Sequence, residues 1–137
     1  MSFKIIKFGG SSIEDAEKIQ HVAGIIEDTI KNSELAIVVS AFGGVTDTIK
    51  TLAEYAAAGK NIDATFDSLI AKHTECAEKL SIKNEINIRR ILDEYFTQLK
   101  SDLLFVAKES HLSSQSLDKV FSYGELLSTK ILSEYLC

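Results

Sequence analysis

The chain has 137 residues, of which 45% are hydrophobic and 26% are charged, and its formal net charge is −5. This composition excludes a mainly disordered chain, because enough apolar surface is present to offset the entropy of ordering the backbone. The acidic charge is spread along the sequence, which argues against nucleic acid as a partner, and no apolar run is long enough to span a bilayer.

The first element predicted is a strand over residues 3–8 (FKIIKF), which ends at the glycine pair 9–10 and enters a tight turn. Apolar residues then recur every three or four positions between Ile13 and Ile30, and this spacing predicts an amphipathic helix that ends near Asn32. Either serine of the pair 11–12 is a candidate for capping that helix.

A second strand is predicted over residues 35–40 (LAIVVS), which is apolar on both faces. Such strands are typical of parallel sheets that are covered on both sides. The order strand, helix, strand therefore predicts a βαβ unit. A second glycine pair, 43–44, follows, and Thr46 or Asp47 is the expected cap of a helix that Gly59 terminates.

The remainder of the chain is predicted to be helical. Residues 63–80 and 84–109 carry apolar side chains at helical spacing and predict a helical hairpin. Residues 115–136 predict a further helix, with an interruption expected at Gly124. The absence of proline favours such long helices.

The first motif with chemical potential is KFGGSS, at residues 7–12, where a strand passes into a helix. Glycine lets backbone N–H groups approach an anion closely, and Lys7 supplies a positive charge that suits a phosphate. The alternative is a plain tight turn with a lysine in water. The motif lacks the spacing of a P-loop and of a dinucleotide fingerprint.

The second motif, SAFGGVTD at residues 40–47, is again a glycine turn between a strand and a helix. Ligands of open parallel sheets lie outside the carboxyl ends of the strands, so two adjacent glycine turns with hydroxyl residues are expected to line one crevice. The alternative is that Thr46 and Asp47 only cap the helix.

The third motif is SYGELLS, at residues 122–128. A glycine inside a helix costs about 1 kcal/mol relative to alanine, so Gly124 indicates close approach of a ligand or of a neighbouring element. Glu125 is a candidate partner for a substrate ammonium group. The alternative is an ordinary solvated glutamate.

The histidines and cysteines suggest no metal site. His21, His73 and His111 lie far apart without metal-ligand spacing, and we expect all three at the surface. Cys76 and Cys137 form no CxxC motif, and the N-terminus does not resemble a signal peptide, so both are expected to be reduced thiols of a cytoplasmic protein.

Three motifs, taken in order, resemble the N-terminal part of an aspartate kinase of the amino-acid kinase family. They are KFGGSS at 7–12, VVSAFGGVTD at 38–47 and SYGELLS at 122–128. Members usually carry threonine where this chain has Ser11, a change that keeps the hydroxyl. The resemblance implies an α/β fold of the carbamate-kinase-like type with a parallel sheet. Here it is represented by its helix-rich N-terminal portion, with about two strands and a helical hairpin.

The resemblance also implies an activity, which is transfer of the γ-phosphoryl group of ATP to the β-carboxylate of L-aspartate, the first step toward lysine, threonine and methionine. ATP with Mg²⁺ is the expected cofactor, and a homo-oligomer is the expected assembly. The resemblance implies five residues at the nucleotide phosphates: Lys7, Phe8, Gly9, Gly10 and Ser11. It also implies that Lys7 is catalytic. Ser40 and Thr46 would help hold the aspartate, and Glu125 would pair with its α-amino group.

Members of the family have a catalytic domain roughly twice as long as this chain, so we expect an N-terminal portion that is inactive alone. It would comprise a βαβ unit (3–58), the helical hairpin (63–109) and a substrate-site helix (115–137). The long hairpin resembles the subgroup that includes lysine-sensitive monofunctional enzymes and bifunctional aspartate kinase–homoserine dehydrogenases. The sequence leaves these two open.

Two alternatives remain. A kinase of another small amino acid in the same family, such as acetylglutamate or glutamate, has the same fold, although SYGELLS argues against it. The second alternative is a non-catalytic module for phosphate binding or assembly.

Overall fold

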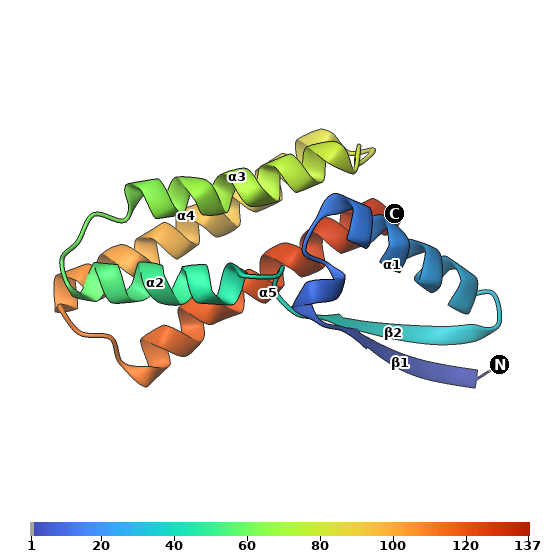
Figure 1. The fold of residues 1–137 in the computed structure, drawn as a ribbon, viewed down its shortest axis with the longest axis horizontal. Helices are drawn as coiled ribbons and strands as arrows, with labels where there is room; N and C mark the ends of the chain where they lie inside the picture. The colour runs from blue at the N-terminus through green and yellow to red at the C-terminus, as the bar shows by residue number, and fades with distance from the viewer. Residues whose placement is uncertain (1) are drawn as a thin grey trace.

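The computed structural model describes residues 2–137 and contains two parallel strands followed by a helix-rich body (Figure 1). The predicted hairpin between residues 63 and 109 is present as two long helices that contact each other. The elements in chain order are β1 (Ser2–Phe8), a 3-10 turn (Gly10–Ser12), α1 (Ala16–Thr29), β2 (Ser33–Val39), α2 (Val45–Ala57), α3 (Asp63–Lys79), α4 (Glu85–Glu109) and α5 (Ser114–Leu136).

The sheet consists of β1 and β2, which pair in parallel with Phe8 opposite Val39. The helix α1 connects them. Just beyond the pairing, the N–H of Ser40 donates a hydrogen bond of 3.1 Å to the carbonyl oxygen of Phe8. Because the strands run in the same direction and stay paired to their ends, the segments that follow them leave the sheet at the same edge.

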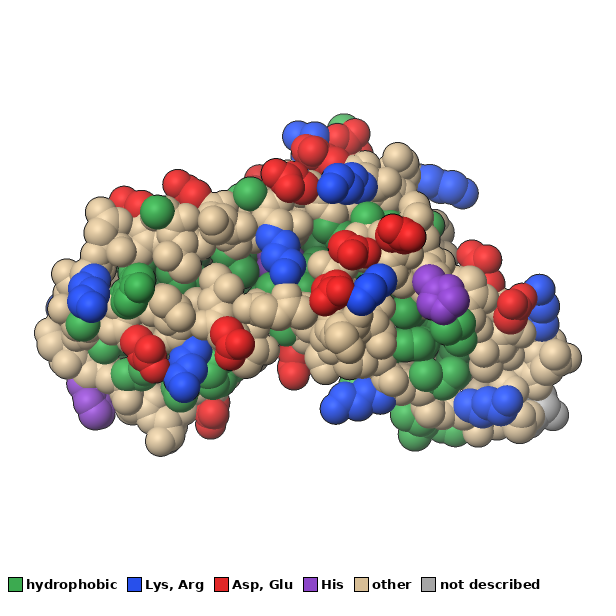
Figure 2. Space-filling model, viewed as in Figure 1, with side chains coloured by type: hydrophobic (Ala, Val, Ile, Leu, Met, Phe, Trp, Pro, Cys, Tyr) green, Lys and Arg blue, Asp and Glu red, His purple; other side chains and the backbone are tan. Residues whose placement is uncertain are grey.

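The residues described cover only one face of this sheet. Ile6, Leu35 and Ile37 pack against the core, on the face that α5 contacts. On the opposite face Phe3 is 63% exposed and Ile5 is 68% exposed. Within residues 2–137 this face of the sheet is therefore open, and Figure 2 shows apolar side chains at the surface of the strand end of the molecule.

The first helix begins later than its hydrophobic pattern predicts. Neither Ser11 nor Ser12 is its cap, because these residues belong to the 3-10 turn. The cap is Asp15, whose backbone is extended and whose carboxylate accepts a hydrogen bond of 2.8 Å from the N–H of Lys18. Ile13 is buried in the loop before the helix, which is why it matches the apolar pattern without being helical.

The second helix also starts differently. Its N-cap is Gly44, with a φ of 83°, and not Thr46 or Asp47, which lie in the first turn of α2. Glycine adopts this left-handed conformation without the steric cost that other residues incur. As the sequence predicts, the helix ends just before Gly59, which has a φ of 71°.

The helix α5 is continuous through Gly124, so the predicted interruption is wrong. Gly124 is instead a packing residue, as the site geometry shows below. One residue earlier, the hydroxyl of the buried Tyr123 donates a hydrogen bond of 2.5 Å to the carboxylate of Asp102 on α4. Burial and this carboxylate both raise the pKa of Tyr123, so the phenol stays protonated and joins the two helices.

The expectation that all three histidines lie at the surface is wrong for His73, which is fully buried. Its ring lies on α3, stacked on the ring of Phe42 at a centroid distance of 5.0 Å. Its Nδ1 is 2.8 Å from the carbonyl oxygen of Leu69 and donates a hydrogen bond to it. His73 lies four residues after Leu69 and three before Cys76, at the spacing of the buried face of α3, and this spacing is the sequence signal for its burial.

Candidate functional site

The two glycine turns meet at the edge where both strands end. We call residues 9–12 the first glycine turn and residues 41–44 the second glycine turn. A Cβ atom built on Gly10 would lie 3.0 Å from the carbonyl oxygen of Ala41 and 3.5 Å from the Cα atom of Gly43. The turns therefore touch backbone to backbone, as the sequence predicts for two strands that end side by side.

In the first glycine turn, two backbone N–H groups lack a hydrogen-bond acceptor among the described residues. The N–H of Ser12 donates to the carbonyl of Gly9 at 3.0 Å, which closes the turn. Within residues 2–137 the N–H groups of Gly10 and Ser11 have no hydrogen-bond acceptor. Unpaired backbone N–H groups at a glycine turn suit an anion such as a phosphate. Lys7, at the end of β1, is exposed.

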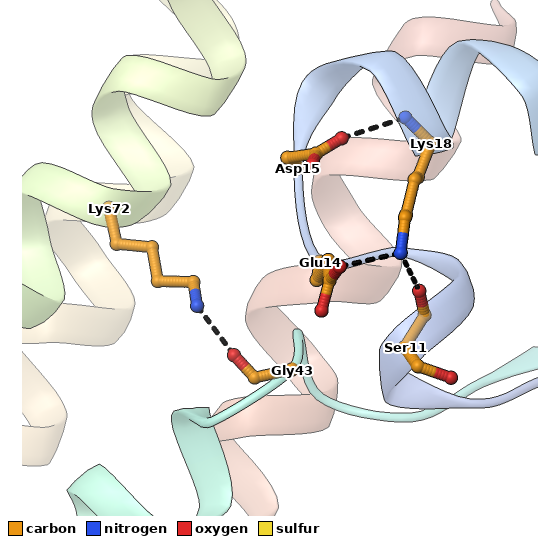
Figure 3. A network of polar contacts seen from close by, with 6 residues as sticks. All are labelled: Ser11, Glu14, Asp15, Lys18, Gly43 and Lys72. Carbon is orange, nitrogen blue, oxygen red and sulfur yellow. Dashed lines mark hydrogen bonds and ion pairs between the residues drawn. The ribbon is translucent and has the colours of Figure 1, made fainter.

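Ion pairing next to this turn involves a different lysine. The ammonium group of Lys18 donates hydrogen bonds to the carbonyl of Ser11, at 3.0 Å, and to the carboxylate of Glu14, at 2.5 Å (Figure 3). The hydrogen bond with Glu14 raises the pKa of Lys18. Lys18 thus holds the first glycine turn in place, whereas Lys7 forms no ion pair with the residues described.

The second glycine turn is a tight connection from β2 to α2. The N–H of Val45 donates to the carbonyl of Phe42 at 2.9 Å, and the N–H of Thr48 donates to the carbonyl of Gly44 at 3.1 Å. Thr46 is exposed in the first turn of α2. Its hydroxyl has no hydrogen-bond partner within residues 2–137, so it remains accessible to a ligand at this turn.

Helix α5 closes the other side of the second glycine turn. A Cβ atom on Gly124 would lie 2.9 Å from the Cβ atom of Ala41 and 3.4 Å from the side chain of Val45. The absence of a side chain at Gly124 therefore permits α5 to touch the turn. Glu125 follows directly and is exposed. Of the two explanations for a helical glycine, the structure shows close approach of a neighbouring element.

Ser128, whose role the sequence does not reveal, ties α5 to the end of β2. Its hydroxyl is buried and donates a hydrogen bond of 2.7 Å to the carbonyl of Ser40. Residues four apart lie on the same face of a helix, so Ser128 sits one turn beyond Gly124 on the face that meets the turn. A serine four residues after Gly124 is the sequence signal that could have identified this contact.

Lys72 is a second residue that sequence reasoning missed. It lies on α3, and its ammonium group donates a hydrogen bond of 2.5 Å to the carbonyl of Gly43 (Figure 3). The two residues are 29 positions apart. No local pattern in the sequence connects them, because only the packing of α3 beside the second glycine turn brings them together.

The residues that the resemblance implies for the substrates gather at one end of the sheet. Lys7 to Ser11 lie on the β1 side, Ser40 and Thr46 on the β2 side, and Glu125 beside the second glycine turn. The junction joins the strand end of the molecule to the helical end, and Figure 2 shows the surface hollowed between these two ends. The arrangement offers backbone donors, hydroxyl groups, one lysine and one carboxylate to a small charged ligand.

No metal centre is formed by this part of the chain alone. Within residues 2–137 no group of three or more His, Cys, Asp or Glu side chains is close enough to hold a metal ion. The donors of the first glycine turn fit phosphate oxygens, so a nucleotide that arrives with its own magnesium ion suits the residues present. In addition, none of the helices described combines the length and the apolar character needed to cross a membrane.

Comparison with known proteins gives consistent matches. The model of the amino acid kinase family matches residues 2–136. The chain is 30% identical to aspartokinase 1 of Arabidopsis thaliana, over 96% of this chain and 23% of that protein. It is also 30% identical to the bifunctional aspartokinase/homoserine dehydrogenase of Daucus carota, over 96% of this chain and 14% of that protein.

Among solved structures, E. coli aspartokinase III in complex with aspartate and ADP superposes with a TM-score of 0.80 at 24% sequence identity. The match covers 99% of this chain and 29% of that one. These findings confirm the resemblance that the three motifs indicate, and the solved structure confirms the fold class. The chain spans between 14% and 29% of the length of these relatives.

Proposed function

Because the chain belongs to the amino acid kinase family, we propose that it forms one side of the active site of an aspartate kinase. The enzyme would phosphorylate the β-carboxylate of L-aspartate with ATP to give 4-phospho-L-aspartate. The observation that carries this proposal is the meeting of the two glycine turns with α5 at the carboxyl end of the sheet. A site shared by three segments can hold two substrates next to each other, and this is what phosphoryl transfer requires.

The first glycine turn forms the phosphate side of the proposed site. The free N–H groups of Gly10 and Ser11 bind phosphate oxygens, with Phe8 directly before the turn and Gly9 at its start. Lys7 forms no ion pair with a carboxylate of the described residues. It is therefore available to stabilise negative charge that develops on the transferring phosphoryl group.

The second glycine turn and α5 form the amino-acid side. Ser40 and Thr46 supply hydroxyl groups to the aspartate, and Glu125 pairs with its α-ammonium group. Glu125 carries a negative charge on the helix surface beside the turn, whereas Lys7 lies at the end of β1. The opposite charges of the substrate, an ammonium group and the phosphorylated carboxylate, thus face protein groups of the complementary sign.

In the proposed reaction an oxygen of the β-carboxylate attacks the γ-phosphorus of ATP, and a carboxyl–phosphate anhydride forms. The bond from the γ-phosphorus to the bridging oxygen breaks, and ADP leaves with the electron pair. Magnesium bound to ATP would neutralise phosphate charge. The contribution of this chain is to position both substrates and to supply positive potential, since such reactions need little covalent help from the protein.

The rest of the kinase would come from residues outside this chain, because its relatives are about four times as long or longer. We therefore propose that residues 1–137 alone are inactive, and that the active enzyme is a cytoplasmic homo-oligomer. Both a monofunctional and a bifunctional parent are compatible with the proposal. Aspartate-dependent release of ADP by the isolated 137-residue chain would contradict it.

The test of the proposed function is a substrate panel with the full-length protein. ADP release is measured with L-aspartate, L-glutamate and N-acetylglutamate at equal concentration, and the acyl phosphate is trapped with hydroxylamine. We expect turnover and a hydroxamate product with aspartate only. Turnover with another amino acid would favour the alternative kinase, and nucleotide binding without any turnover would favour a non-catalytic module.

A further inference from the structure

We propose that α3 positions the second glycine turn for the amino-acid substrate through two adjacent side chains, Lys72 and His73. This inference rests on the proposed function, which places the amino acid at that turn. The two residues act by different contacts, a hydrogen bond to the backbone of the turn and a ring stack on its side chain. Neither residue is expected to touch the substrate, so both are positioning residues.

The ring stack anchors the turn in the core. Phe42, in the second glycine turn, is 2% exposed, and its ring lies nearly parallel to that of His73, at 5.0 Å and an interplanar angle of 15°. The other contact of the His73 ring is edge to face with Phe96 on α4, at 5.7 Å. Phe96 in turn contacts Phe66 edge to face. The stack therefore connects the turn to two long helices.

The role of His73 is that of a flat ring and not of an acid or base. Its Nδ1 hydrogen is used by the carbonyl of Leu69, and its Nε2 is buried without a partner among the described residues. A buried nitrogen of this kind contacts no solvent and no substrate. What the ring offers to Phe42 is shape and stacking area.

Lys72 fixes the turn from the backbone side. Its ammonium group donates to the carbonyl of Gly43, and it also lies 4.0 Å from the position of a Cβ atom on Gly44, the residue of positive φ. The N-cap Gly44 has no side chain to stabilise the start of α2. Lys72, on another helix, is the charged donor that holds the carbonyl of Gly43, an acceptor for which the described residues offer no backbone donor.

The consequence for the site is geometric. Ser40 and Thr46 flank the second glycine turn on either side, so their spacing depends on the path of residues 41–45 between them. If the carbonyl of Gly43 and the ring of Phe42 are released, the hydroxyl groups proposed to hold aspartate lose their spacing. The nucleotide side, on the first glycine turn, has a further contact of its own, the hydrogen bond from Lys18 to the carbonyl of Ser11.

The test compares variants of α3 in the full-length protein. Lys72→Met removes the donor and keeps the length of the side chain, whereas Lys79→Met removes a lysine two turns further along the same helix that makes no hydrogen bond to either turn. His73→Phe keeps a stacking ring, whereas His73→Leu has a similar volume without one. KM for aspartate, KM for ATP and kcat are measured, together with amide hydrogen exchange over residues 40–48.

We expect Lys72→Met and His73→Leu to raise KM for aspartate about 10-fold, with KM for ATP within about twofold of the wild type, since a hydrogen bond to a charged group contributes on this scale. Exchange over 40–48 should accelerate in both. His73→Phe and Lys79→Met should match the wild type in every measurement.

An unchanged KM for aspartate in Lys72→Met and His73→Leu would overturn the proposal, whether or not exchange accelerates. An equal loss in His73→Phe would also overturn it, because it would mean that imidazole chemistry is needed. A wild-type protein without aspartate-dependent turnover refutes the proposed function instead. In that case unchanged exchange over 40–48 in the variants would also refute the positioning of the turn.

Discussion

Substitution of Gly124 by alanine tests whether α5 must touch the second glycine turn. The added Cβ would lie 2.9 Å from the Cβ of Ala41, against a normal separation of about 3.5–4.0 Å between such atoms. The atom it meets is fixed to the backbone of the turn and has no flexible end to move aside. The other close side chains, of Ile49 and Val45, are at 3.4 Å, which is ordinary contact.

Two effects of opposite sign decide the outcome. Alanine is favoured over glycine inside a helix by about 1 kcal/mol. Overpacking at a tight contact costs about 1–3 kcal/mol. We therefore expect Gly124→Ala to lower the free energy of unfolding by up to about 2 kcal/mol, and to move Ser40 and Glu125 apart.

The chain contains a matched control for this experiment. Gly24 lies inside α1, and a Cβ at that position would have nothing within 4 Å. Gly24→Ala should therefore stabilise the chain by about 0.5–1 kcal/mol. Adding Ala41→Gly to Gly124→Ala removes the clashing atom, so the two substitutions should show a favourable coupling of about 1–3 kcal/mol in a double-mutant cycle.

The assay is urea unfolding followed by circular dichroism for the wild type, the single variants and the double variant. If Gly124→Ala stabilises the chain as much as Gly24→Ala does, the close contact between α5 and the turn has no energetic weight. The account of the site as a junction of three segments would then be wrong.

Two further predictions concern the histidine stack and the open sheet face. Burial, and to a lesser extent the charge of Lys72, lower the pKa of His73 from 6.5 to about 4. Since the unfolded chain takes up this proton first, stability should fall as the pH drops from about 6.5 to about 4, by about 3 kcal/mol from this group. Urea unfolding across this range should show the slope in the wild type, and its persistence in His73→Phe would refute the assignment. The exposed apolar face of the sheet predicts concentration-dependent self-association in light scattering that Ile5→Lys reduces, and a monodisperse wild type at high concentration would contradict it.

Much of the fold follows from local sequence patterns. The two strands end at glycine pairs and the helices have clear apolar spacing, so their existence and order are predictable from residues 3–136. The boundaries of the helices are less predictable, because more than one nearby residue fits the start of each helix. Ile13 extends the apolar pattern of α1 backwards although it is buried in a loop, and Gly44 caps α2 by its conformation where Thr46 offers a more familiar capping side chain.

The candidate site, too, is predictable from the sequence only in part. The meeting of the glycine turns is predictable, since parallel strands that pair to their ends must deliver both turns to one edge. The contributions of Lys72 and His73 are not, because they depend on how α3 packs against the turn. The role of Gly124 was ambiguous in the sequence between a ligand and a neighbour, and only the distance to Ala41 decides it.

Steady-state kinetics of the full-length protein shows whether Lys7 and Glu125 serve two sides of one site. Matched controls are Lys4→Ala, on the same strand, and Glu134→Ala, on the same helix. Lys7→Ala should lower kcat by about 100-fold or more, because it removes charge stabilisation during transfer. Glu125→Ala should raise KM for aspartate at least about 10-fold with KM for ATP unchanged. An unchanged KM for aspartate in Glu125→Ala, at saturating ATP, would show that Glu125 does not bind the amino-acid substrate.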